Sequence, residues 1–280
     1  MKKNTLPPGR QRPTVKEVVG ALEKFAPLPL QESYDNAGLQ LGLTETEVSG
    51  ALLCLDVTEK IVDEAIARDC NVIISHHPLI FHRLSHITGG NYVERAVAKA
   101  IKADIAIISM HTNLDNSQGG VSFMMAEKMG MSDVSFLCPP RSYSSDDDGP
   151  TVQYASGVIG SLPQPLPAAD FITMLKRVFN VECVQANQLL RRDISRVALC
   201  GGAGSFAIDD ALRKGADAFV TGEMHYHEYF GHDGELQIAV IGHYQSEQFT
   251  NQLFLNILHD ALPELRCELT KTNTNPIIYL

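Results

Sequence analysis

The ten histidines of this 280-residue chain fall in two groups, and residues 112–224 contain none. Most of them follow short apolar runs that read as buried strands. Imidazole side chains can bind metal ions and transfer protons near neutral pH. The first group is His76, His77, His82, His86 and His111, and the second is His225, His227, His232, His243 and His259. The two groups therefore mark the places where this chain could do chemistry.

Acidic residues accompany both groups, namely Asp115, Glu223, Glu228 and Glu247. Imidazole and carboxylate groups without a nearby thiolate are the ligands typical of zinc, manganese, iron or nickel. Several histidines combined with more than one carboxylate that can bridge favour two ions over one. The sequence thus indicates a site for two divalent metal ions, whose identity the residue types leave open among Zn, Fe, Mn and Ni.

Structural readings of the same residues stay open. Neighbouring side chains on a strand point to opposite faces, so His76 and His77 are either ordinary loop residues or ligands of separate ions. Pro78 and the apolar flanks favour a rigid, buried position. Asp115 could instead cap a turn, and Glu247 could stabilise the start of a helix through the helix dipole. Four histidines read as surface or structural residues: His82, His86, His232 and His259.

Alternating strands and helices must position these side chains. Apolar runs predict strands at 51–55, 72–75, 105–109, 197–200, 218–221 and 238–241. Helical patterns lie between them at 58–70 and 205–217, which favours mostly parallel sheets covered by helices. Ligand-binding groups collect at the carboxyl ends of such strands, where the histidines stand. Upstream, Thr14 and Glu17 predict a capped helix through Phe25.

The two halves of the chain resemble each other. A shift of 146 residues places Cys54 on Cys200 and residues 74–75 on 220–221, and a shift of 132 places His111 on His243 and Asp115 on Glu247. We therefore expect two similar α/β domains. The first is predicted to contain residues 1–128 and 236–280, and the second residues 129–235. Residues 141–150 read as a solvated loop.

Composition narrows the function classes. The net charge of −10 argues against direct nucleic-acid binding, which needs a clustered basic surface. No apolar run reaches the roughly 18 residues of a membrane helix, and the first residues lack the apolar segment of a signal peptide. The six cysteines form no C-x-x-C pair. We expect a cytoplasmic protein.

Five motifs in the expected order and spacing resemble those of a known family. They are ESYDNAGLQLG, ISHHPLIF, HTNLD, TGEMHYHE and GHYQSE. The chain resembles the Nif-three-like family of dinuclear-metal proteins, also called GTP cyclohydrolase I type 2 homologues, from about Thr14 to Leu280. The family usually carries Trp where this chain has Tyr34, which is a conservative difference. Residues 129–196 are too few for the extra domain that some members contain.

The resemblance implies a fold and a site. The fold would be two similar three-layer α/β domains with mixed, mostly parallel sheets and a metal site in the cleft between them, assembled as a homohexamer. His77 and Asp115 would bind one ion, His76 and His243 the other, and Glu247 would bridge both. Three more residues match positions near the centre and could orient the ligands: His111, Glu223 and His227.

The resemblance implies one function, and the same ligands would serve a second. One is a metal-dependent hydrolase, like a GTP cyclohydrolase, acting on a nucleotide-like or other small-molecule substrate. The alternative is a non-enzymatic metal-handling (chaperone-like) protein or a regulatory scaffold. The sequence has no P-loop and no G-x-G-x-x-G motif. Nothing outside the resemblance therefore selects GTP.

Overall fold

The computed structural model describes residues 12–145 and 151–280, and these residues form two compact units. Unit 1 contains residues 12–113 and 250–274. Unit 2 contains residues 114–145, 151–249 and 275–280. Each unit has its own sheet, helices and hydrophobic core, and each holds part of the residues singled out above.

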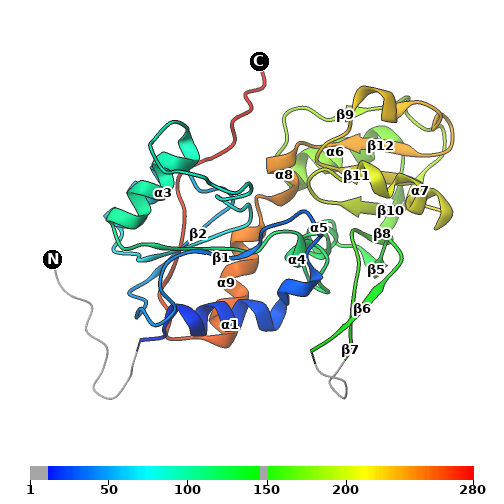
Figure 1. Ribbon diagram of the computed structural model, residues 1–280. Helices are drawn as coiled ribbons and strands as arrows, with labels where there is room; N and C mark the ends of the chain where they lie inside the picture. Colours follow the sequence, from blue (N-terminus) through cyan, green and yellow to red (C-terminus); the bar gives the residue numbers. More distant parts are fainter. Residues whose placement is uncertain (1–11, 146–150) are drawn as a thin grey trace. The chain divides into compact units, whose positions relative to one another are not determined.

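The sheet of unit 1 has the strand order β1-β4-β3-β2-β13. Its strands are β1 (Gly38–Leu41), β4 (Ala106–Ser109), β3 (Val72–Ser75), β2 (Ala51–Cys54) and β13 (Cys267–Leu269). Strands β1 and β2 are labelled in Figure 1. All neighbouring strands are parallel except β1, which pairs antiparallel with β4. Every residue of β2, β3 and β4 is buried, which explains their uninterrupted apolar sequences.

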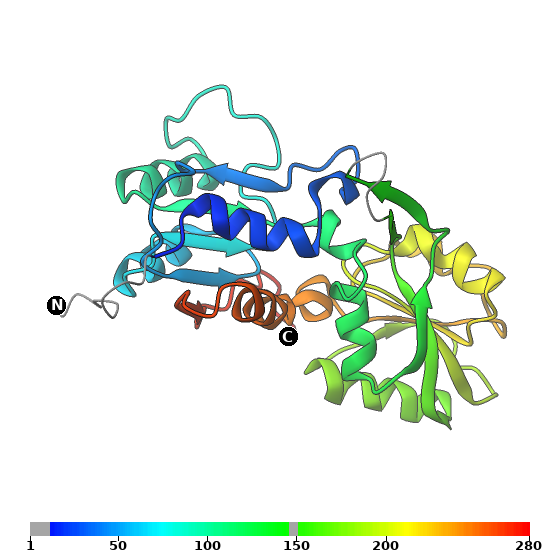
Figure 2. The ribbon, with the colours of Figure 1, turned by 90° about the horizontal axis from the view of Figure 1, so that it is seen from below.

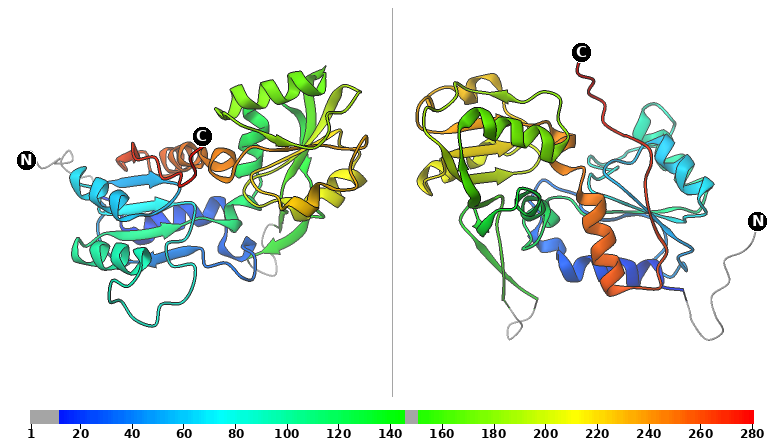
Figure 3. Two further views of the ribbon diagram at one scale, coloured as in Figure 1. Left: turned by 90° about the horizontal axis from the view of Figure 1, so that it is seen from above. Right: turned by 180° about the vertical axis from the view of Figure 1, so that it is seen from behind.

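Helices cover both faces of this sheet (Figures 2 and 3). Helices α1 (Val15–Phe25) and α9 (Thr250–Ala261) contact each other on one face, and α2 (Glu59–Ala67) and α3 (Tyr92–Lys102) pack together on the other. The capping box of Thr14 and Glu17 begins α1, as the sequence predicts. A 3-10 turn (Leu28–Leu30) follows α1. Unit 1 is thus a three-layer α/β unit.

The sheet of unit 2 has the order β5-β8-β10-β11-β12-β9. Its strands are β5 (Ser132–Phe136), β8 (Val158–Leu166), β10 (Ile194–Cys200), β11 (Ala218–Thr221), β12 (Gln237–Val240) and β9 (Gln185–Ala186). The three neighbours β10, β11 and β12 are parallel, and the flanking strands are antiparallel to them.

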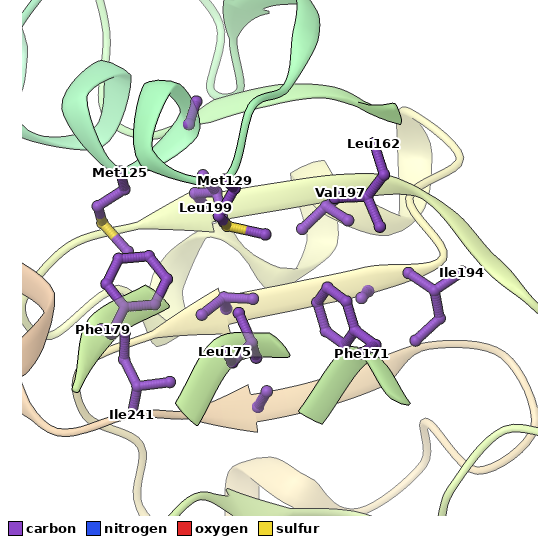
Figure 4. Close-up of a cluster of buried hydrophobic side chains, with 14 of the residues drawn as sticks. Met125, Met129, Leu162, Phe171, Leu175, Phe179, Ile194, Val197, Leu199 and Ile241 are labelled. Carbon is purple, nitrogen blue, oxygen red and sulfur yellow. The ribbon is translucent and has the colours of Figure 1, made fainter. Parts of the chain in front are cut away.

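Alternate residues of β10 supply two cores in unit 2. Val197 and Leu199 pack under helices α5 (Val121–Lys128) and α6 (Ala168–Phe179), in the cluster drawn in Figure 4. Ala198 and Cys200 face the opposite side, with the 3-10 turn η2 (Ser205–Ala207) and α7 (Ile208–Arg213). This period of two is that of a strand buried on both faces.

The remaining elements of unit 2 are short. The turn η3 (Tyr226–Tyr229) follows β11, and α8 (His243–Glu247) follows β12. Strands β6 (Arg141–Ser144) and β7 (Thr151–Tyr154) pair with each other. The prediction of a loop over 141–150 was therefore wrong for 141–144, because cross-strand partners stabilise β6; residues 146–150 lie outside the described residues.

The expected similarity of the two halves is present in the strand register. Ala51 pairs with Val72 and Cys54 with Ser75, and the residues 146 positions later pair in the same register, Val197 with Ala218 and Cys200 with Thr221. In the two larger sheets, the described strands form five parallel and four antiparallel pairs. The fold class is therefore a mixed, mostly parallel α/β fold, as predicted.

The division of the chain differs from the expected domain boundaries. Residues 236–249 were assigned to the first domain, but β12 pairs with β11 and therefore belongs to the sheet of unit 2. Residues 114–128 were also assigned to the first domain, but α5 packs on β8 and β10 of unit 2. Periodicity predicts that a strand exists, whereas its neighbour in the sheet depends on long-range pairing.

Candidate metal centre

Three histidines of unit 1 lie together where two parallel strands end. His76 and His77 follow β3 directly, and His111 stands two residues after β4, its neighbour in the sheet. One nitrogen from each ring lies within 4.8 Å of the others. The centroids of the adjacent His76 and His77 rings are 4.9 Å apart and the rings are tilted by 50°. Since the chain has left the strand at Ser75, the adjacent side chains are not forced to opposite sides.

The imidazoles of His76 and His77 are each held through Nδ1. His76 Nδ1 lies 2.8 Å from the backbone oxygen of Met110, and His77 Nδ1 lies 2.7 Å from Oδ1 of Asp56. A carbonyl or an ionised carboxylate can only accept, so both Nδ1 atoms carry the hydrogen. In the neutral ring, Nε2 is then the nitrogen that carries the lone pair. Metal-binding histidines in proteins are typically oriented in this way.

His111 is oriented in the same manner by Asp35. The distance from His111 Nδ1 to Asp35 Oδ1 is 2.7 Å, and Asp35 also accepts hydrogen bonds from the backbone and hydroxyl of Thr112. Burial raises the pKa of Asp35, but the hydrogen bond and charge of His111 and the bonds from Thr112 and Asn36 lower that pKa to about 2. Asp35 is therefore an ionised acceptor at neutral pH. Nε2 of His111 is thus a third imidazole nitrogen that could bind a metal ion. The sequence predicted only that His111 orients other ligands.

Asp35 and Asp56 were not among the residues predicted from the sequence to lie at the site. Asp35 stands within the motif ESYDNAGLQLG, and Asp56 follows β2, the neighbour of the strand β3 that ends at Ser75. An acidic residue directly after a predicted neighbouring strand was the available signal for Asp56. Asp35 approaches His111 across 76 positions of sequence, so no local pattern could have paired them.

Unit 2 holds a second set of donors around α8. His243 and Glu247 begin and end this helix and lie on one face because they are four residues apart. His243 Nε2 is 3.1 Å from Oε2 of Glu247, and His243 Nδ1 is 3.1 Å from Oε1 of Glu223. Glu247 is almost fully buried, whereas Glu223 is exposed. The exposed carboxylate of Glu223 can therefore orient His243, as expected for a residue beside a metal ligand.

Asp115 joins this second set. It ends the short helix α4 (Thr112–Asp115), and one of its carboxylate oxygens lies within 4.8 Å of one from Glu247. His227, also in unit 2, is exposed on η3, and its ring contacts those of Tyr226 and Phe230. The structure therefore brings Asp115, His243 and Glu247 together and gives His227 aromatic neighbours.

Two glycines allow the backbone to approach α8 closely. Gly202 has φ +61°, and a Cβ at this position would lie 2.5 Å from Oε1 of Glu247. A Cβ at Gly222 would lie 2.9 Å from Cα of His243 and 2.7 Å from the carbonyl oxygen of Gly202. These loops follow β10 and β11, so the carboxyl ends of the parallel strands form the surface against which the donors of α8 rest.

The donors fit divalent metal ions by their chemistry. Unit 1 offers three imidazole nitrogens whose hydrogens are held on the opposite side of the ring, and unit 2 offers one imidazole and two carboxylates. Such a nitrogen and oxygen set suits zinc, iron, manganese or nickel. No thiol belongs to either set among the described residues.

One family model and several known proteins match most of this chain. Residues 13–276 match the model of Duf34/NIF3 (NGG1p interacting factor 3). The "GTP cyclohydrolase 1 type 2 homolog" of Lactococcus lactis is 34% identical over 244 residues, covering 86% of this chain and 88% of that protein. The protein of the same name from Clostridium acetobutylicum is 30% identical over 235 residues, covering 83% and 85%.

Solved structures share the fold. The Staphylococcus aureus hypothetical protein SA1388 superimposes with a TM-score of 0.87 at 28% identity, covering 96% of this chain and all of that one. None of the helices in residues 12–145 and 151–280 is long and apolar enough to cross a membrane. The matched length, the shared fold and the motif residues around both donor sets lead to one conclusion: this chain belongs to the Duf34/NIF3 family.

Proposed function

We propose that this chain is a hydrolase that depends on two divalent metal ions. The observation that carries the proposal is the gathering of His76, His77 and His111, each with an oxygen against Nδ1 and with one nitrogen of each ring within 4.8 Å of the others. Three imidazoles gathered and oriented in this way are typical of a metal site and rare in a core that needs only packing. The names of the relatives, GTP cyclohydrolase 1 type 2 homolog, support a hydrolytic reaction.

The proposed ligands are His76, His77, Asp115, His243 and Glu247, as the family resemblance implies. Bound ions would supply a Lewis acid and an activated water for hydrolysis. The protein's own residues supply orientation: Asp56 fixes the ring of His77, and Glu223 fixes the ring of His243. His111, held by Asp35, offers a further nitrogen donor beside His76 and His77.

The substrate class we propose is a nucleotide-like small molecule. The relatives' name refers to GTP, and the acidic chain, with a net charge of −10, does not favour a nucleic-acid polymer. We further propose that the protein acts in the cytoplasm as a homo-oligomer, which the family resemblance implies to be a hexamer. Light scattering of the purified chain gives the molecular mass that tests this assembly.

Metal analysis combined with turnover tests the function. Metal-free protein is reloaded separately with zinc, manganese, iron or nickel, and bound metal per chain is measured by mass spectrometry. Hydrolysis of GTP and a panel of other nucleotides is then followed for the wild type, for Glu247→Gln and for Glu235→Gln, an exposed carboxylate of unit 2 that serves as control.

We expect two ions per chain in the wild type and the control. Glu247→Gln should lose bound metal and turnover together, because it would replace a proposed anionic ligand by a neutral one. Turnover that persists in metal-free Glu247→Gln would refute the hydrolase as proposed. Rapid exchange of metal without turnover on any substrate would instead favour a metal-handling role.

A further inference from the structure

Unit 2 contains a cavity of about 290 Å³ directly beside His243. Its walls come from the loops after β10, β11 and β12, where ligands of open α/β sheets usually bind. The segment 275–280 closes one side through Ile277 and Tyr279. The volume corresponds to about ten molecules of liquid water, so a small planar group fits. Because His243 lies in the wall, a molecule in this cavity would adjoin the proposed metal site.

The chemistry of the walls selects against anions. Two carboxylates, Glu223 and Glu228, line the cavity. Among the other polar side chains that line it are Gln185, Ser205, His225 and His243. Among the described residues that line it, none is a lysine or an arginine. A phosphate or carboxylate of a ligand would therefore be repelled, whereas N–H groups would find acceptors.

Glu228 is held ready to accept hydrogen bonds. Ser205 Oγ donates to its Oε1 at 2.7 Å, and the backbone N–H of His225 donates to its Oε2 at 2.6 Å. The bond from Ser205, followed by that from His225, lowers the pKa of Glu228, so the side chain is ionised at neutral pH. Each carboxylate oxygen can accept more than one hydrogen bond, so two N–H groups of a ligand can still bind side by side.

We propose that this cavity binds an amidine-like end of the substrate, that is, a planar group with two neighbouring N–H donors, neutral or cationic. This assignment rests on the proposed function, because it places the bond to be hydrolysed beside His243. Glu228 would accept the paired N–H groups. Glu223 also lines the cavity, and its Oε1 lies 3.1 Å from Nδ1 of His243. Any phosphate of the substrate would lie outside this cavity.

Three probes of one shape and different charge test the assignment. Benzamidine, benzamide and benzoate are each titrated into metal-loaded and metal-free wild-type protein, with binding followed by calorimetry and ligand-observed NMR. We expect benzamidine to bind at least about tenfold more tightly than benzamide, because a charge-assisted bidentate pair is stronger than a neutral one. Benzoate should bind most weakly.

Three variants locate the binding. Glu228→Gln should weaken benzamidine about tenfold, and the exposed control Glu235→Gln should leave it unchanged. Ala203→Leu adds bulk to the cavity wall without changing charge and should weaken benzamidine and benzamide alike. Thermal unfolding of each variant shows whether it is folded.

The outcomes separate the two proposals. Benzoate binding as tightly as benzamidine, or unchanged benzamidine affinity in folded Glu228→Gln and Ala203→Leu, would overturn the assignment of the cavity. If the wild type binds no metal but shows the expected order of probes and variants, the hydrolase proposal fails, and only the preference of the cavity for an amidine-like group is supported.

Discussion

Replacing Asp56 should weaken metal binding without touching a proposed ligand. Asp56 Oδ1 accepts from His77 Nδ1 at 2.7 Å, and its Oδ2 accepts from the hydroxyl of Thr274 at 2.6 Å. In Asp56→Asn, the amide oxygen can face His77 while the Thr274 hydroxyl turns to accept from the amide nitrogen. The orientation of His77 then survives, but its partner is no longer charged.

The size of the effect follows from this geometry. A hydrogen bond to a charged group contributes about 1.5–3 kcal/mol and a neutral one about 0.5–1.5 kcal/mol. Asp56→Asn should therefore make the free energy of metal binding less favourable by about 1–1.5 kcal/mol. That loss corresponds to about a tenfold higher Kd for the metal. Asp56→Ala removes the acceptor altogether. We expect the Kd for the metal to rise by about 100-fold, the upper end of the loss of affinity seen when residues that orient metal ligands are replaced.

Competition with a chromophoric chelator measures the zinc Kd of the wild type and both variants. The control is Asp63→Asn, a mostly exposed aspartate of unit 1 that pairs with Lys99 and should bind zinc like the wild type. Nitrogen-15 spectra of the metal-free proteins report which ring nitrogen of His77 carries the hydrogen. Wild-type zinc affinity in folded Asp56→Ala would refute the reasoning that Asp56 prepares His77 as a ligand.

Three further substitutions test the packing within each unit. Burial raises the pKa of Glu64, but hydrogen bonds from residues 270–272 and the charge of Arg68 lower it to about 2. Since the pKa is 4.5 when unperturbed, Glu64 stabilises the fold fully above that pH and progressively less toward pH 2. Glu64→Gln should therefore lower the free energy of unfolding by about 1–2 kcal/mol at pH 7, after allowance for solvent screening, and by less at pH 3, as measured in urea. Gly222→Ala should reduce zinc affinity by displacing His243. Gly20→Ala, at an exposed helical position where an added Cβ meets nothing within 4 Å, serves as the comparison, and equal zinc affinities of the two variants would contradict the close approach at Gly222. Phe171→Ala should cost about 3–5 kcal/mol in denaturant titrations, because Phe171 is fully buried under the sheet of unit 2; a loss below about 1 kcal/mol would contradict that packing.

Local patterns in the sequence were sufficient for the central strands and for the positions of the histidines. Apolar runs predicted β2, β3, β4, β10, β11 and β12, and the shift of 146 residues anticipated the shared register of β2–β3 and β10–β11. Buried parallel strands are apolar along their whole length, so their sequences are easily recognised. Because ligand-binding groups collect at the carboxyl ends of such strands, the residues that follow them were the candidates for metal ligands.

Weakly patterned elements were not found in this way. Strands β5, β6, β7 and β9 are mostly exposed, so their sequences lack the apolar runs that identified the others. Strand β13 lies at an edge and joins the sheet of unit 1 from the far end of the chain. Its place beside β2 depends on a pairing between residues more than 200 positions apart, and local hydrophobic periodicity carries no information on such a pairing.

The sequence by itself determined which residue types could bind metal and the strand ends from which they project. Only the tertiary structure decided how those side chains are oriented. Asp56 reaches His77 across 21 residues and Asp35 reaches His111 across 76, because neighbouring strands bring their loops together. The same holds for β12, whose pairing with β11 places His243 and Glu247 in unit 2. Side-chain periodicity reports local burial, whereas hydrogen-bond partners and unit boundaries depend on which strands become neighbours in the sheet.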